Sequence, residues 1–167
     1  MTLTTVPSFA QENIPQISMR ECLSFRLGTV HYGINLLEVQ EIRSYTKPKR
    51  IANAPKELLG VINLRGVLVP IIDLRIKLQC ETAAYNGATV VIILKLRSKV
   101  IGAVVDSVSD VVQLEPGCIQ PPPAVQSNGD TSFITGLATV GERMLILMDT
   151  ESFVGDFAPG ATGPTVH

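Results

Sequence analysis

The chain has 167 residues, of which 46% are hydrophobic and 17% are charged, and its net charge at pH 7 is −1. This length and composition predict a globular body with either one good core or two small lobes that share one. The near-zero net charge argues against a nucleic-acid-binding surface, which needs a basic stripe. The longest apolar runs are only strand-length, so we expect no direct insertion into a membrane.

Cysteine and histidine are too few and too scattered for a metal site. Cys22, Cys80 and Cys118 have no CxxC spacing, and His31 and His167 are the only histidines. We therefore expect reduced thiols, no metal and no cofactor. Because the N-terminus lacks the basic and apolar regions of a signal peptide, we expect the protein to stay in the cytoplasm.

The chain begins with residues 1–19, which are polar and without a period, so we expect a flexible tail there. An alternating apolar strand follows, and the two-residue loop Gly28-Thr29 predicts a type II′ hairpin into residues 30–36. Gly33 lies inside this return strand, where it predicts a bend or bulge in a strand that curls into a barrel.

The next segment, residues 37–45, alternates less cleanly. We assign Val39 and Glu41 to one face and Ile42 to the other, and the period does not show which face is buried. Residues 46–54 form a connector with three basic side chains, which we expect to be a solvated face.

The sharpest hairpin signal lies in residues 61–72, where two apolar strands flank only Arg65-Gly66. Glycine at the second turn position predicts a type II turn, in which that residue alone needs a positive φ. The side chain of Arg65 must then project from the tip of the hairpin.

The second half of the chain repeats the plan of the first. A polar linker at residues 81–87 leads into a hairpin at 88–105, a bent strand at 108–114 and a last hairpin at 133–148. Strand signals at this spacing, with turn residues between them, predict small barrels.

The repeat is visible in paired positions. At a shift of 69 residues Leu27 coincides with Leu96, Gly33 with Gly102 and Val39 with Val108, and at a shift of 76 Gly60 coincides with Gly136 and Asp73 with Asp149. We therefore expect two lobes of one plan, roughly residues 28–86 and 87–150, with terminal strands able to cross between them. The seam between like lobes is a natural docking place.

No catalytic residues are expected. The chain has neither a GxSxG nucleophile motif nor a phosphate-binding glycine loop. Asp73 and Asp149 each follow an apolar strand, where capping of a short helical turn explains both. Asp106 and Asp110 flank a bent strand, and we expect them to be solvated. The protein is therefore expected not to be an enzyme.

An interaction surface remains as the alternative to chemistry, with residues 39–42 and 63–66 as candidates. An exposed arginine on a tight turn is often only solvated, yet arginine is over-represented among interface anchors. Glu41 is equally explained as a charge that protects an edge strand from aggregation. The residues alone leave both interpretations open.

Four strings resemble the CheW family of bacterial chemotaxis coupling proteins: VQEIRSY, GVINLRGVLVPIIDLR, GAVVDSVSDVVQL and ITGLATVGERMLILMD. The strings follow the family's order and spacing, and the resemblance covers residues 20–154 as one CheW-like domain. Residues 155–167 lie outside it, and we expect a disordered tail there. The resemblance implies an all-β fold of two SH3-like five-stranded barrels that share a hydrophobic core, with short helical turns.

The same resemblance implies a non-enzymatic adaptor. Family members couple the cytoplasmic tip of methyl-accepting receptors to the regulatory domain of the histidine kinase CheA, in signalling arrays at the inner membrane. The alternative is a scaffold of the same type in a non-flagellar chemosensory pathway. A small-barrel enzyme and a nucleic-acid-binding barrel are rivals, but the chain lacks an acid–base set and a basic aromatic platform.

Carried over by position, the resemblance implies a receptor-binding surface made of Val39, Glu41, Ile42, Gly60, Asn63, Arg65 and Val90. Val39 and Ile42 would give apolar contact to a helical hairpin lying in a groove. Glu41 and Arg65 would pair with opposite charges on that hairpin and set its register. Arg43 and Tyr45 continue the same edge and are expected to face the kinase.

Overall fold

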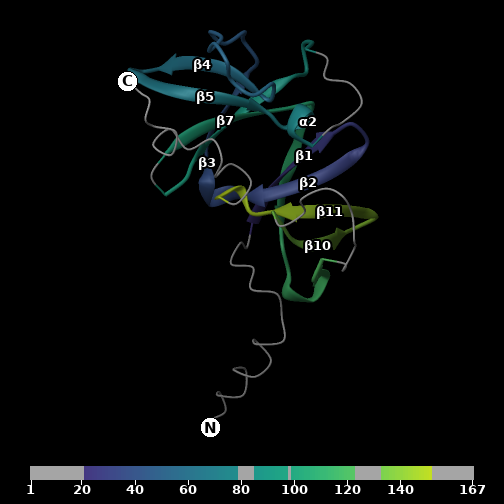
Figure 1. Ribbon diagram of the computed structural model, residues 1–167. Coiled ribbons are helices and arrows are strands. Elements are labelled where there is room, and N and C mark those ends of the chain that lie inside the picture. Colours follow the sequence, from purple (N-terminus) through teal and green to yellow (C-terminus); the bar gives the residue numbers. More distant parts are fainter. Residues whose placement is uncertain (1–20, 79–84, 98, 123–132, 152–167) are drawn as a thin grey trace.

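The computed structural model describes residues 21–78, 85–97, 99–122 and 133–151, and in these ranges the strands form two sheets (Figure 1). Sheet A contains β1 (Glu21–Leu27), β2 (Val30–Asn35), β8 (Ser107–Gln113), β9 (Ile119–Gln120), β10 (Ile134–Val140) and β11 (Arg143–Met148). Sheet B contains β3 (Val39–Ser44), β4 (Leu58–Leu64), β5 (Val67–Asp73), β6 (Val90–Lys95) and β7 (Val100–Val105). Short helical turns are η2 (Leu36–Glu38), α2 (Leu74–Lys77) and η3 (Pro116–Cys118).

Each sheet combines strands from both halves of the chain. The order in sheet A is β8-β1-β2-β11-β10-β9, and the order in sheet B is β3-β6-β7-β5-β4. The sheets therefore do not follow the expected division at residues 28–86 and 87–150, because central strands as well as terminal ones cross. Parallel neighbours cannot be joined by a tight hairpin, and the parallel pairs β2–β11 and β5–β7 join distant parts of the chain.

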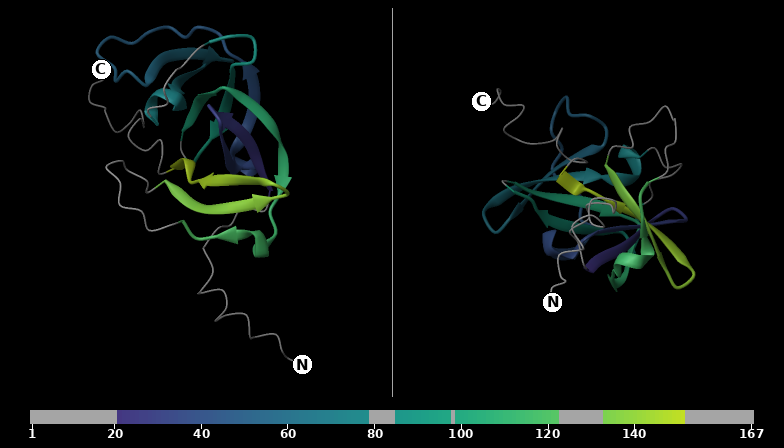
Figure 2. Two further views of the ribbon diagram at one scale, coloured as in Figure 1. Left: turned by 90° about the vertical axis from the view of Figure 1, so that its right-hand side faces the viewer. Right: turned by 90° about the horizontal axis from the view of Figure 1, so that it is seen from below.

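Both sheets close into barrels because the segment that follows one edge strand pairs with a strand at the opposite edge. In sheet A, β8 leads through η3 into β9, which pairs with β10 on the opposite edge. In sheet B, the chain after β3 reaches β4, where Lys49 and Val61 exchange two N–H···O bonds of 2.9 Å. The expected all-β fold of two lobes is confirmed, with β9 as a short sixth strand in sheet A. The left view in Figure 2 places the blue strands of sheet B at one end and the yellow-green strands of sheet A at the other.

Three apolar clusters explain why both faces of the central strands are buried. One cluster lies between the sheets and includes Phe25 and Ile34 from sheet A with Ile92 from sheet B. A second cluster fills barrel A, and a third fills barrel B. The expected shared core is therefore present. Full burial of one large apolar side chain in such a core contributes about 1.5–3 kcal/mol to the stability of the fold.

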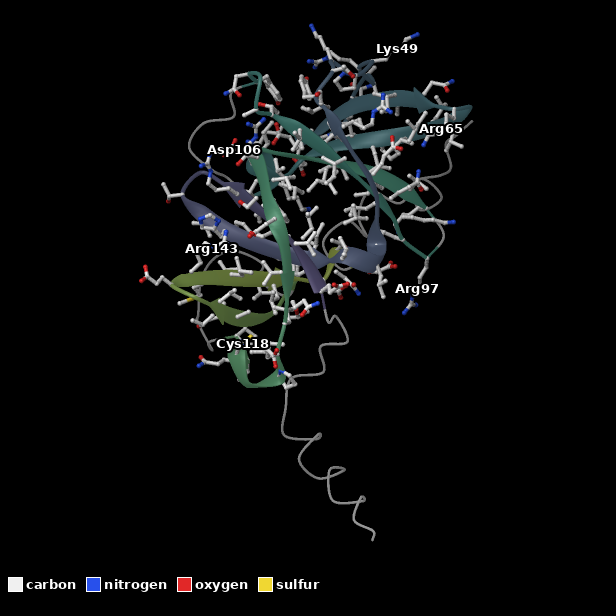
Figure 3. The ribbon with its side chains drawn as sticks, turned by 180° about the vertical axis from the view of Figure 1, so that it is seen from behind. Lys49, Arg65, Arg97, Asp106, Cys118 and Arg143 are labelled. Carbon is white, nitrogen blue, oxygen red and sulfur yellow. The ribbon has the colours of Figure 1, made fainter. Side chains whose placement is uncertain are left out.

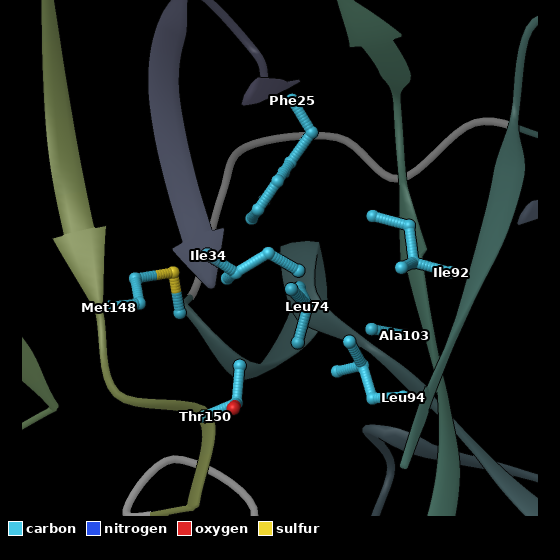
Figure 4. A pocket seen from close by; sticks show the side chains of 8 residues that line it. All are labelled: Phe25, Ile34, Leu74, Ile92, Leu94, Ala103, Met148 and Thr150. Carbon is cyan, nitrogen blue, oxygen red and sulfur yellow. The ribbon is translucent and has the colours of Figure 1, made fainter. Parts of the chain in front are cut away.

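Packing in the shared core is nearly complete. A gap of about 10 Å³ remains, and Figure 4 shows the eight side chains around it, of which only Thr150 is polar. A site for a small molecule needs hundreds of cubic ångströms. The gap is therefore a packing defect in the core and no ligand site.

The hairpin turns follow the twist of the strands. Gly28 has a φ of 64° and Thr29 is not in the positive region, as the expected type II′ turn requires. Arg65 and Gly66 have φ values of 53° and 91°, so this turn is type I′ and the expected type II turn is wrong. A type I′ turn matches the right-handed twist of its two strands, whereas a type II turn would splay them.

The glycines of the repeat stand where two strands pair in parallel. A Cβ atom on Gly33 would lie 3.0 Å from the Cys22 sulfur, and one on Gly102 would lie 2.6 Å from Cδ1 of Ile71. Gly102 is the register partner of Ile71, and Gly33 is the partner of Leu147. Close packing of neighbouring side chains therefore explains these glycines directly.

Candidate functional site

The edge strand β3 contains a bulge between Val39 and Glu41, and this bulge decides which of its side chains share a face. Val39 pairs with Leu94 and Ile42 pairs with Ile92, and both partners belong to the shared core. Glu41 pairs instead with Ile93, which faces the interior of barrel B. The assignment of Val39 and Glu41 to one face is thus wrong, since a bulge shifts the alternation by one residue.

Glu41 lies at the centre of an ion cluster on this edge. Its carboxylate accepts a bond of 3.0 Å from Arg43 and one of 2.9 Å from Arg65. These two bonds lower the pKa of Glu41, so the group stays ionised at neutral pH. The side chains of Arg43 and Arg65 are 40% and 63% exposed, so both guanidinium groups also face solvent.

The β4–β5 hairpin positions Arg65. The Asn63 side chain accepts a bond of 2.8 Å from the Gly66 N–H and so stabilises the tight turn. Gly60, further back on β4, is buried and has a φ of 150°. A Cβ atom there would lie 2.1 Å from the carbonyl oxygen of Lys49. Gly60 therefore acts by letting the connector close barrel B, and it cannot offer a side chain to a partner.

The remaining predicted positions, Val90 on β6 and Tyr45 just after β3, lie beside the C-terminal end of β3. Val90 pairs with Ser44 and packs against the shared core while remaining partly exposed. The Tyr45 N–H donates to the Thr89 carbonyl at 3.1 Å. The Tyr45 ring stacks on the Tyr85 ring with centroids 4.6 Å apart. Tyr45 is therefore held in place, and its hydroxyl pKa is raised mainly by burial.

A buried ion cluster was missed by the sequence reasoning. Arg75, which is 1% exposed, donates two bonds of 3.0 Å to Asp73 and one of 2.8 Å to Asp106. Asp106 also accepts a 2.5 Å bond from the Gly28 N–H. The expectation that Asp106 is solvated is wrong, because Asp106 joins α2, beside barrel B, to the β1–β2 turn of barrel A.

Tyr85 completes this cluster. Its hydroxyl donates to Asp73 at 2.6 Å, and the Arg75 guanidinium lies 4.9 Å from the ring centre. Burial, followed by the bond to Asp73, raises the hydroxyl pKa. Asp73 also caps α2 by accepting from the Arg75 N–H at 2.9 Å, as expected from the sequence. A cluster of this kind stabilises the junction of the barrels.

The described ranges contain no group of three or more histidine, cysteine or acidic residues that could hold a metal ion. Within the same ranges, every helix is too short or too polar to cross a membrane.

Comparison with known proteins identifies this architecture. A family model described as a CheW-like domain matches residues 21–157. The chain belongs to the CheW family. The chain is 48% identical over 152 residues to Chemotaxis protein CheW of Klebsiella aerogenes, and the match covers 91% of this chain and 89% of that protein.

More distant relatives support the same family assignment. The chain is 32% identical to Chemotaxis protein CheW of Bacillus subtilis over 129 residues, which cover 77% of this chain and 82% of that protein. It also superposes on the crystal structure of scaffolding protein TtCheW from Thermoanaerobacter tengcongensis with a TM-score of 0.73 and 28% identity. That match covers 78% of this chain and 88% of the other.

Proposed function

We propose that this chain is a non-enzymatic adaptor that couples methyl-accepting chemotaxis receptors to the histidine kinase CheA. The observation that carries the proposal is the match to the CheW-like domain over residues 21–157, together with 48% identity to a chemotaxis CheW protein. We place the protein in the cytoplasm, recruited to receptor arrays at the inner membrane.

The receptor would dock on the edge formed by β3 and the β4–β5 hairpin. Ile42, 45% exposed, would give apolar contact to a receptor helix, with Val39 beneath it at the core. One Arg65 nitrogen bonds Glu41, and the remaining N–H groups of the guanidinium are available to a receptor carboxylate. The main role of Glu41 would then be to orient Arg65, and any pairing of Glu41 with the receptor would be additional.

The other predicted positions take supporting roles in this proposal. Asn63 would hold the turn that presents Arg65, Gly60 would allow the barrel to close behind it, and Val90 would border the groove. Arg43, near the end of β3, and Tyr45, just after β3, would face the kinase.

Arg65→Glu tests the receptor site. The side chain is 63% exposed at a turn tip, so we expect an unchanged circular dichroism spectrum and melting curve. We expect affinity for a receptor signalling-tip fragment to fall by about tenfold or more, because an attractive charge becomes repulsive. Arg97→Glu, on the exposed β6–β7 loop, is the matched control. Wild-type affinity in Arg65→Glu, measured by co-sedimentation with CheA and receptor fragment, would remove Arg65 from the site.

A further inference from the structure

We propose that the connector between β3 and β4, residues 46–57, is a basic docking surface for a carboxylate-rich segment of the receptor hairpin. The proposal rests on the proposed function, because it extends the receptor site across β4 and names the chemistry of the segment that binds there.

The connector is held firmly against barrel B. Lys49 exchanges two backbone bonds with Val61, and Gly60 brings its backbone against Lys49 and Arg50. Pro48, beside Lys49, is buried. Because the backbone at Lys49 and Arg50 is fixed, both side chains leave the surface from fixed positions, while their long stems can still adjust to a partner.

This surface concentrates positive charge in a protein whose net charge is −1. Four basic side chains of the connector are exposed: Lys47, Lys49, Arg50 and Lys56. Within the described residues none of the four forms an ion pair, whereas Arg43, Arg65 and Arg143 all do. Glu57 is the one acidic residue of the connector and is partly buried. Among the described residues, no ion pair balances the charge of these four side chains.

The basic surface is continuous with the predicted receptor site. Lys49 lies beside Val61 on β4, and Arg65, in the turn that follows β4, is four residues further along the chain, about 13 Å at the usual rise of a strand. That separation is longer than the Debye length of about 8–10 Å, so salt largely screens the two regions from each other and a partner must contact each of them directly. Figure 3 shows Lys49 and Arg65 at the same end of the molecule, with Arg97 further away. Ile51, 40% exposed beside Arg50, adds an apolar contact to this surface.

Carboxylates on a protein partner fit this surface better than nucleic acid does. Single-stranded nucleic acid needs aromatic side chains on which its bases stack, and residues 46–57 contain none. A helix that contacts Ile42 and Arg65 and continues past β4 would bring its next turns over Lys49 and Arg50. Aspartate and glutamate at those turns would complement the charge and speed association.

The test compares two pairs of substitutions that each remove one lysine and one arginine. The test variant is Lys49→Gln/Arg50→Gln, and the control is Lys95→Gln/Arg97→Gln on the exposed end of the β6–β7 hairpin. Association with a receptor signalling-tip fragment is measured at about 50 and 300 mM salt. We expect the test variant to associate about tenfold more slowly at low salt and to show a weaker salt dependence than wild type. The control should behave as wild type.

Two results would overturn the inference: test and control variants that bind the receptor fragment alike, or a loss confined to CheA or to a single-stranded oligonucleotide. Arg65→Glu and Ile42→Asp are measured in parallel. If these two weaken receptor binding while the test variant does not, only the basic surface is wrong. If all of the variants bind as wild type, the receptor site itself is misplaced.

Discussion

Replacing Arg75 by methionine should destabilise the protein more than any change on its surface. Methionine keeps the apolar length of the side chain but removes the charge and all of its donors. Asp73, which is 0% exposed, and Asp106, which is 24% exposed, then lose the cation that bonds both. Removing one partner of a buried ion pair typically costs about 3–5 kcal/mol. A domain of ordinary stability has about 5–15 kcal/mol in total, so the loss should be readily measurable.

The same cluster predicts a defined pH dependence. Burial by itself would raise the pKa of Asp106, but the Gly28 N–H and the Arg75 guanidinium together hold it below its ordinary value. Because the folded pKa is the lower one, this stabilisation is complete above the unfolded value of about 3.9 and is lost as pH falls further. The difference in unfolding free energy between wild type and Arg75→Met should therefore be constant near neutral pH and shrink below about pH 4.

Urea unfolding followed by circular dichroism, repeated from neutral to acid pH, measures both effects. Asp106→Asn is a milder companion that keeps the shape of the side chain and should cost about 1–3 kcal/mol. Asp106→Asn should also reduce the decrease in unfolding free energy that occurs at acid pH. A loss below about 1 kcal/mol in Arg75→Met, with unchanged dependence on denaturant, would refute the role of the cluster in joining the barrels.

Two further predictions concern glycines. Gly60→Ala should destabilise the fold, with about 1–3 kcal/mol from backbone strain alone, because φ is 150° and Cβ would meet the Lys49 carbonyl at 2.1 Å. An alanine variant with the wild-type melting temperature would contradict the closure of barrel B at Lys49. Gly102→Ala should cost more than Gly33→Ala, since the nearest approach of the new Cβ is 2.6 Å in the first and 3.0 Å in the second. Equal unfolding free energies for the two variants would show that this packing does not decide their effect.

Much of the architecture followed from local patterns. Alternating apolar residues located the hairpins, and the positive φ of Gly28 was predictable because a two-residue loop led by glycine favours a type II′ turn. The repeat of Gly33 at Gly102 indicated two lobes of one plan. The resemblance of four sequence strings to the CheW family indicated the family from the sequence alone. The positions named for the receptor site remain predictions, and the structure adds that Glu41 and Arg65 bond each other.

Other features depended on contacts between residues far apart in the chain. No local pattern indicates that β2 pairs with β11, that Gly60 meets Lys49, or that a bulge separates Val39 from Glu41. Asp106 was expected to be solvated because it flanks a bent strand, yet Arg75 from another element neutralises it. Periodicity records which side of a strand is apolar, whereas the choice of neighbouring strand and of charge partner is made only when the whole chain packs.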